Sequence, residues 1–107
     1  MKFLVGTWPT EEGSKNLPPS ADFAAQADWF RNKIADGTID VCHHAPDRAI
    51  FIFNAESPAA LEALLDSIPL SRLMNRRIEP LSDFWTHTAG VLDFLRKAET
   101  KGRSGTA

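Results

Sequence analysis

Cysteine is almost absent from this sequence, which excludes two kinds of stabilising site. Cys42 is the single cysteine, so no internal disulfide can form and no cysteine pair has the spacing of a zinc site. Chains from reducing compartments commonly have few or no disulfide-forming cysteines. We therefore expect a cytoplasmic location.

The sequence also lacks a long apolar run and a marked excess of one charge. Its apolar start, residues 1–8, is too short for a signal peptide or a membrane span. The formal net charge is −2, whereas nucleic-acid binders are usually basic. The one basic cluster, Arg72, Arg76 and Arg77, precedes Glu79 and is typical of a solvated strand edge, with an anionic ligand as the alternative. We expect neither a membrane nor a nucleic acid as partner.

Motifs for common cofactors are missing as well. The sequence has no glycine-rich phosphate loop, nucleophile elbow or covalent haem-attachment motif. We therefore expect no cofactor, while haem held by one histidine without a covalent link stays open. No metal site is predicted either: Asp40, Cys42 and His44 alternate on one strand, but such spacing is a weak metal pattern. A buried cysteine beside a hydrogen-bonded histidine is the favoured interpretation.

The size and composition are those of one globular domain. The chain has 107 residues, of which 43% are hydrophobic and 24% charged. We place a single domain over residues 1–100. Residues 101–107 are small and polar, and we expect them to form a flexible tail.

The first third of the chain predicts a strand and a helix. Residues 2–8 are rich in strand formers, and Pro9 ends the strand because it has no N–H for the ladder. A polar loop is expected over residues 10–20. Ser20 is expected to cap a helix that Gly37 terminates. Four residues at helical spacing form its apolar stripe: Phe23, Ala27, Phe30 and Ile34.

A β-hairpin is predicted in the middle of the chain. Residues 38–44 alternate as a strand, with one face formed by Ile39, Val41 and His43 and the other by Asp40, Cys42 and His44. Turn residues follow at 45–48. Residues 49–54 form the next strand, which is apolar on both faces.

The rest of the chain predicts a helix, an edge strand and a last helix. Ser57 can cap the first of these helices, with Pro58 in its first turn. Pro80 restricts the strand over residues 76–81 to an edge of the sheet. The last helix is expected over residues 88–99.

This order predicts an α+β protein with a ferredoxin-like βαββαβ core, a four-stranded antiparallel sheet and an extra C-terminal helix. Both core helices would pack on one face of the sheet, so the other face should be polar. The sequence instead predicts an apolar second face, because Leu4 and Trp8 on the first strand point to the face opposite that of Phe3 and Val5. An apolar face of this size is rarely left exposed. We therefore expect a second copy of the chain, or a ligand, to cover it.

Several segments resemble the muconolactone isomerase-like family. They are residues 37–38, the strand over residues 49–53, the helix start over residues 57–61, and residues 68–70 with Met74, Ile78 and Glu79. The resemblance implies a dimeric α/β barrel, in which two ferredoxin-like units pack sheet to sheet. It also implies a pocket for a small apolar or acidic metabolite between each sheet and its helices, and a homodimer as the assembly.

The reaction that the resemblance implies is cofactor-free proton transfer on an unsaturated lactone or similar metabolite, an isomerase activity. A single histidine or carboxylate in a water-poor pocket can remove and return the proton. His43 and His44 are adjacent and should point to opposite faces, so the one that faces the pocket is the best catalytic candidate. Asp40 or Glu79 is the second.

Pocket walls are expected from aromatic and polar residues that follow or line the strands. The candidates for substrate binding are Trp8, Phe51, Phe53, Glu79, Trp85 and His87. Core or interface packing is the alternative for the tryptophans, and a simple connector is the alternative for residues 83–87. In a dimer, that connector could instead reach across to the partner's pocket.

Two other functions stay open from the sequence alone. One is a non-catalytic dimeric module that uses the same pocket to bind a small molecule. The other is a cofactor-independent monooxygenase of the same barrel class, which rests on analogy of fold. Whether the chain is an enzyme therefore depends on the site.

Overall fold

A computed structural model describes the backbone of residues 1–106 and the side chains of residues 1–102. The elements in chain order are β1 (Lys2–Pro9), α1 (Glu11–Lys15), α2 (Ser20–Ala35), β2 (Ile39–Ala45), β3 (Arg48–Asn54), α3 (Pro58–Asp66), the 3-10 turn η1 (Ser71–Leu73), β4 (Met74–Leu81) and α4 (Phe84–Thr106). This is the predicted βαββαβ order with one additional short helix and a terminal helix.

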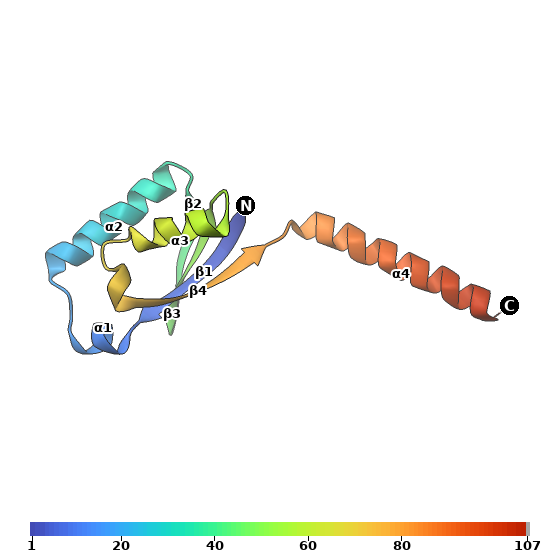
Figure 1. Cartoon of the computed structure of the whole chain (residues 1–107), viewed down its shortest axis with the longest axis horizontal. Helices are drawn as coiled ribbons and strands as arrows, with labels where there is room; N and C mark the ends of the chain where they lie inside the picture. Colours follow the sequence, from blue (N-terminus) through green and yellow to red (C-terminus); the bar gives the residue numbers. More distant parts are fainter. Residues whose placement is uncertain (107) are drawn as a thin grey trace.

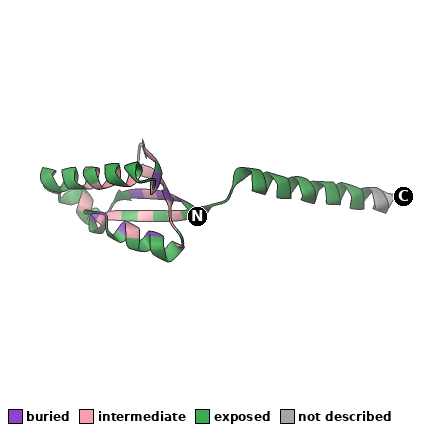
Figure 2. Cartoon of the chain, turned by 90° about the horizontal axis from the view of Figure 1, so that it is seen from above, coloured by how far each residue is buried: buried purple, intermediate pink, exposed green. Residues whose placement is uncertain are grey.

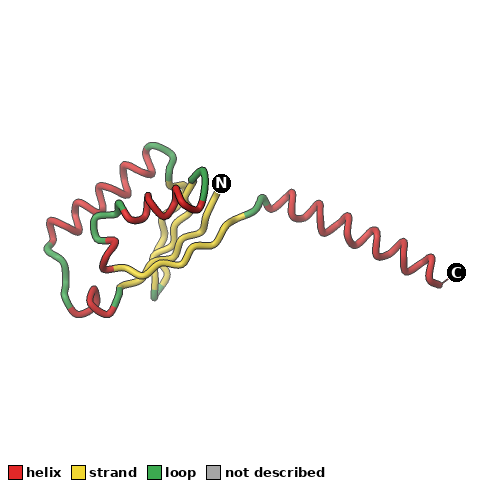
Figure 3. The backbone as a smooth tube through the Cα atoms, in the orientation of Figure 1, coloured by secondary structure: helices red, strands yellow, loops and turns green. Residues whose placement is uncertain are grey.

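The four strands form one antiparallel sheet in the order β2-β3-β1-β4 (Figure 3). The two central strands are therefore β1 and β3, and β4 lies at an edge, as Pro80 predicted. Val5 pairs with Phe51 on one side and with Ile78 on the other. These three side chains share one face of the sheet, and α2 and α3 cover that face, which we call the helix face.

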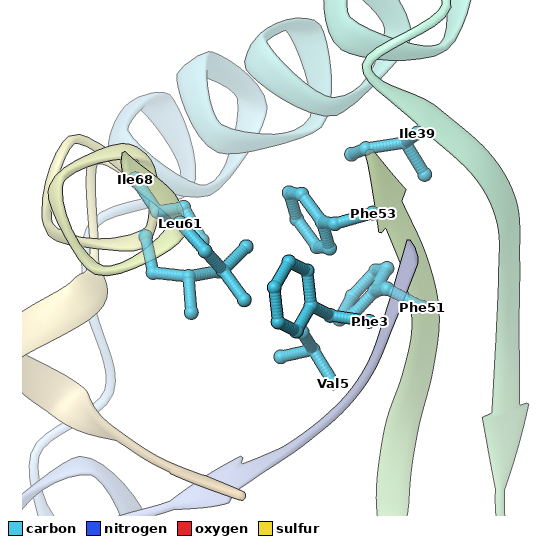
Figure 4. Close-up of a cluster of buried hydrophobic side chains, with 8 residues drawn as sticks. Phe3, Val5, Ile39, Phe51, Phe53, Leu61 and Ile68 are labelled. Carbon is cyan, nitrogen blue, oxygen red and sulfur yellow. The ribbon is translucent and has the colours of Figure 1, made fainter. Parts of the chain in front are cut away.

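The hydrophobic core lies between the helix face and α3. Figure 4 shows Phe3, Val5 and Phe53 of the sheet directed toward Leu61 and Ile68. All five side chains are almost completely removed from solvent. Ser57 begins α3 as predicted, because its Oγ accepts a hydrogen bond of 3.1 Å from the Ala60 N–H.

The ends of α2 are only partly as predicted. Gly37 terminates the helix in the left-handed region with φ 83°, which glycine adopts without steric cost. Ser20 was expected to be the cap, but it is the first helical residue, and Pro19 occupies the cap position without a side-chain hydrogen bond. Proline's fixed φ lets the chain enter the helix without a capping side chain.

The segment predicted as a polar loop contains the short helix α1. Thr10 caps it, accepting a hydrogen bond of 3.0 Å from the Gly13 N–H. A β-carbon on Gly13 would lie 2.5 Å from the Leu73 carbonyl oxygen, so only glycine fits there. The cap and this close approach to η1 explain why the segment is ordered.

A β-bulge near the start of β2 overturns the predicted alternation of this strand. Ile39 pairs with Phe53 and Val41 with Ile52, so an extra residue, Asp40, stands between consecutive pairs. Ile39 consequently lies on the helix face, while Val41 and His43 lie on the opposite face. Sequence spacing alone predicted that these three would share a face.

The terminal helix α4 is longer than predicted and projects away from the other elements (Figure 1). It begins at Phe84 rather than at residue 88, because the Asp83 carboxylate accepts a hydrogen bond of 2.8 Å from the Thr86 N–H. Every residue from 84 to 102 is exposed (Figure 2). Residue 107 lies outside the described residues, and a flexible tail over 101–107 stays a prediction.

Candidate functional site

A pocket of about 680 Å³ lies between α2 and the helix face of the sheet. It exists because α2 stands away from the sheet and contributes no fully buried residue. Phe30 bridges the gap and stacks on Phe51, with ring centroids 4.7 Å apart and planes at 4°. A volume of this size is typical of small-molecule sites.

The walls of the pocket are mainly apolar, with polar groups near one end. Apolar side chains come from α2, β3 and the start of β4, namely Phe23, Ala27, Phe30, Ile34, Ala49, Phe51 and Met74. The polar groups His44, Asp47 and Arg48 come from the β2–β3 hairpin. An apolar cavity with a few convergent polar groups is the usual form of a small-molecule site.

The two adjacent histidines lie on opposite faces of the sheet. His44 pairs with Ala49 and lines the pocket on the helix face. His43 pairs with Ile50 and lies on the opposite face, which we call the open face. Of the two histidine candidates, the structure therefore brings His44 into the pocket.

Asp40 is separated from the pocket by the bulge. Its carboxylate accepts hydrogen bonds from the Lys2 ammonium and, at 2.8 Å, from Asn54 Nδ2. The hydrogen bond from Lys2, followed by that from Asn54, lowers the pKa of Asp40. Asp40 does not join Cys42 and His44 as a group. Among the residues with described side chains, no set of three or more histidine, cysteine or acidic residues could hold a metal ion.

Cys42 lines the pocket beside His44 in a half-buried position. Burial raises the pKa of its thiol. The nucleophilic form of cysteine is the thiolate, which a raised pKa disfavours at neutral pH. A role as part of the pocket wall is therefore more consistent with its surroundings than nucleophilic catalysis.

The remaining predicted wall residues fall into four places. Trp8 and Phe51 line the pocket. Phe53 is completely buried in the core instead, because it points toward α3. Glu79 lies on the open face, while Trp85 and its neighbour His87 lie on α4. Neither α4 residue is part of the pocket wall within one chain.

Charged residues of the pocket were missed by the sequence reasoning. Arg48 lies at its end and forms an ion pair of 2.9 Å with Asp47, and Arg31 of α2 pairs with Asp28 at 2.9 Å. The turn at residues 45–48 was recognised only for its chemistry as a reversal. The turn directly follows His44 in the sequence. That position was the signal that could have identified Asp47 and Arg48 as pocket residues.

The open face carries a second, smaller hollow of about 560 Å³. Gly6 forms its floor, since it has no side chain, and Leu4 and Ile50 flank it. Arg77 and Glu79 form an ion pair of 2.9 Å at its rim. Leu4, Val41, Ile50 and Ile52 are half-buried here, so this face is apolar at its centre, as predicted.

Solved structures that share this fold include a muconolactone isomerase and a dehydrochlorinase. A crystal structure of muconolactone isomerase is 20% identical with a TM-score of 0.64, and the match covers 78% of this chain and 90% of that chain. A 5-chloro-2-hydroxyhydroquinone dehydrochlorinase from Burkholderia phenoliruptrix, in complex with 2,5-dihydroxybenzoquinone, is 16% identical with a TM-score of 0.59, and the match covers 77% and 94%. No family model and no curated protein sequence matches the chain.

The strand order, the helices on one face of the sheet and these likenesses define the class of the protein. It is an α+β protein with a four-stranded antiparallel sheet and a ferredoxin-like fold. More specifically, the fold is of the muconolactone isomerase-like type. Among the described residues, no helix is long and apolar enough to cross a membrane.

Proposed function

We propose that this chain is a small-molecule enzyme that catalyses cofactor-free proton transfer on an unsaturated lactone or a similar acidic metabolite. His44 is the group that removes the proton beside the carbonyl and returns it at another carbon. The observation that carries the proposal is the position of His44 in the wall of a mainly apolar pocket. Histidine is the side chain most often used for proton transfer.

The shape and charge of the pocket support an acidic substrate. Apolar walls would hold the carbon skeleton, while His44 is exposed to solvent in the free chain. Arg31 and Arg48 both line the pocket, and a guanidinium can bind a carboxylate through two parallel hydrogen bonds. Each arginine now pairs with one neighbouring aspartate, and a substrate carboxylate would compete for it.

The test is proton NMR of muconolactone and simpler butenolides in deuterated buffer, with and without the protein. We expect protein-dependent deuterium uptake or migration of the double bond. The two histidines form a matched pair, because they are adjacent but face opposite sides of the sheet. His44→Gln should lower the exchange rate by about 10²- to 10⁴-fold, whereas His43→Gln should leave it nearly unchanged.

The outcomes separate the candidate functions. Binding of a butenolide without exchange would reject the enzyme and indicate a binding module. Exchange that survives both substitutions would reject His44 as the proton carrier. Consumption of oxygen with a quinol substrate would favour the monooxygenase.

We also propose a homodimer that forms through the open faces of two sheets. The support is the half-buried apolar centre of this face, formed by Leu4, Val41, Ile50 and Ile52. Two such faces pack about 10 Å apart in sandwiches, which removes their apolar side chains from water. The cytoplasm stays the proposed location, since the single cysteine suits a reducing compartment.

A further inference from the structure

Thr7 is the one polar residue that is buried in the described part of the chain, with 5% of its surface exposed. It follows Phe3 and Val5 in the inward alternation of β1, and Figure 4 shows those two side chains directed into the core. Among the residues with described side chains, none forms a hydrogen bond with the Thr7 hydroxyl. A buried hydroxyl without a partner costs free energy, so a partner from outside the chain would satisfy it.

The Thr7 hydroxyl opens into a space beside it. Within the described residues, no buried side-chain nitrogen or oxygen is both closed off from solvent and without a partner. Two spaces border Thr7: the pocket of about 680 Å³, and a void of about 10 Å³ that Leu65 and Arg76 also line. The void has room for one water at most, whereas the pocket can hold a ligand.

Strand pairing places Thr7 in one row with His44. Ala49 of β3 pairs with His44 on one side and with Thr7 on the other, and all three line the pocket. Two strand spacings, about 10 Å, separate the backbones of His44 and Thr7. Ala49 between them has a methyl group as its whole side chain. A polar group therefore faces the pocket at each end of the row, with room for one small ring between them.

The proposed proton transfer creates a negative charge that needs a hydrogen-bond donor. When His44 takes the proton beside the carbonyl, the electron pair of the broken C–H bond forms an enolate, and charge collects on the carbonyl oxygen. A donor already directed at this oxygen stabilises the transition state, and more strongly away from water. Arg31 and Arg48 are each paired with an aspartate, and their side chains are 76% and 48% exposed. The buried, unpaired hydroxyl of Thr7 meets this requirement better.

We infer that the Thr7 hydroxyl donates a hydrogen bond to the carbonyl oxygen of the substrate while His44 moves the proton. This inference rests on the proposed function. The hydroxyl keeps its own proton throughout. His44 returns the proton that it took to another carbon, which restores the carbonyl group. Together the two residues select a small cyclic carbonyl compound whose ring reaches His44 while its carbonyl oxygen reaches Thr7.

The contact can be measured by carbon NMR of a butenolide labelled with carbon-13 at its carbonyl. A hydrogen bond to a carbonyl oxygen moves this signal downfield whether or not the molecule reacts. We expect a downfield shift on binding to the native protein and to Thr7→Ser, which keeps the hydroxyl. The shift should be lost with Thr7→Val, which replaces the hydroxyl by a methyl group of similar size.

The same variants separate an effect on the reaction from an effect on the fold. At saturating butenolide, Thr7→Val should lower the rate of proton exchange about 10²-fold, as expected for the loss of one such donor, and Thr7→Ser should stay near the native rate. Thermal unfolding of Thr7→Val should occur at the native temperature or above, because the substitution removes a buried polar group that has no partner.

Three results would overturn the inference. They are an unshifted carbonyl signal in the native complex, a shift that survives in Thr7→Val, and an unchanged exchange rate in a Thr7→Val protein that unfolds at a lower temperature. In the last case the hydroxyl would serve the fold, through a water in the small void. A shift that depends on the hydroxyl in a complex without proton exchange would instead reject the proposed reaction and keep Thr7 as the carbonyl contact.

Discussion

Asp83 is the residue that sets the start of α4. Its carboxylate accepts hydrogen bonds from the backbone N–H and the hydroxyl of Thr86, at 2.8 and 3.0 Å. The backbone bond is the main cause that lowers the pKa of Asp83. A negative charge at this position also interacts favourably with the positive end of the helix dipole.

This geometry predicts a pH dependence of α4. Because the pKa of Asp83 is lower in the folded helix, its stabilisation is fully present above the ordinary aspartate value of about 3.9 and is lost as pH falls through the folded pKa. Circular dichroism at 222 nm should therefore fall in acid. Asp83→Asn keeps a capping side chain that does not titrate, so its curve should be flatter. Identical acid curves for the two proteins would contradict the prediction.

At the scale of elements, the two core helices are held to the sheet in different ways. The α3 helix buries Leu61 and Leu65 completely. The α2 helix has no fully buried residue, and its contact with the sheet includes the stack of Phe30 on Phe51. The pocket is the space that remains beside this stack. A weakly packed helix over a cavity can open locally without unfolding the core.

Phe30→Ala should therefore loosen α2 and leave α3 in place. Loss of the stack and of the half-buried ring is expected to cost about 1–2 kcal/mol in the local opening of α2. Amide hydrogen exchange should become about tenfold faster in α2 and remain unchanged in α3. Phe23→Ala is the control, since this ring at the pocket rim is largely exposed. Equal acceleration in both helices would mean that the Phe30 substitution destabilises the whole fold.

At the scale of the whole molecule, the open face and α4 both present apolar surface that one chain does not cover. The chain measures 73 × 30 × 23 Å, and α4 accounts for the long dimension. Apolar surface on two separate elements is difficult to reconcile with a monomer. A dimer that uses the open face would cover the first of these surfaces.

Ile52→Asp tests this assembly at the centre of the open face, where Ile52 pairs with Val41 and Leu4. A buried unpaired charge in the interface should convert the dimer into a monomer at micromolar concentration, as light scattering would measure. Ala63→Asp, on the exposed side of α3, is the control and should leave the mass unchanged. A native protein that is already monomeric would exclude the proposed interface.

Much of the fold could be predicted because its signals are local. Ser57 and Pro58 determine the start of α3, and Gly37 determines the end of α2, through backbone preferences that do not depend on distant residues. Strand alternation and Pro80 were sufficient to predict the strands and the edge position of β4. The apolar open face was likewise visible in the alternation of Leu4 with Phe3 and Val5.

The candidate site was only partly predictable, because it depends on how the elements meet. The bulge at Asp40 arises from pairing between β2 and β3, and it moves Asp40 away from Cys42 and His44. The pairing in the hairpin likewise decides that His44 rather than His43 faces α2. A shift of one residue in the pairing of a strand moves every side chain that follows to the other face of the sheet.

The sequence by itself thus determined the βαββαβ order of the core elements, several of their ends and the two apolar faces of the sheet, since each follows from nearby residues. The tertiary structure alone decided that α2 stands off the sheet to leave a pocket, that Phe53 enters the core, and that α4 finds no partner within its own chain. Those features depend on distances between segments remote in sequence, and local propensity does not specify such distances.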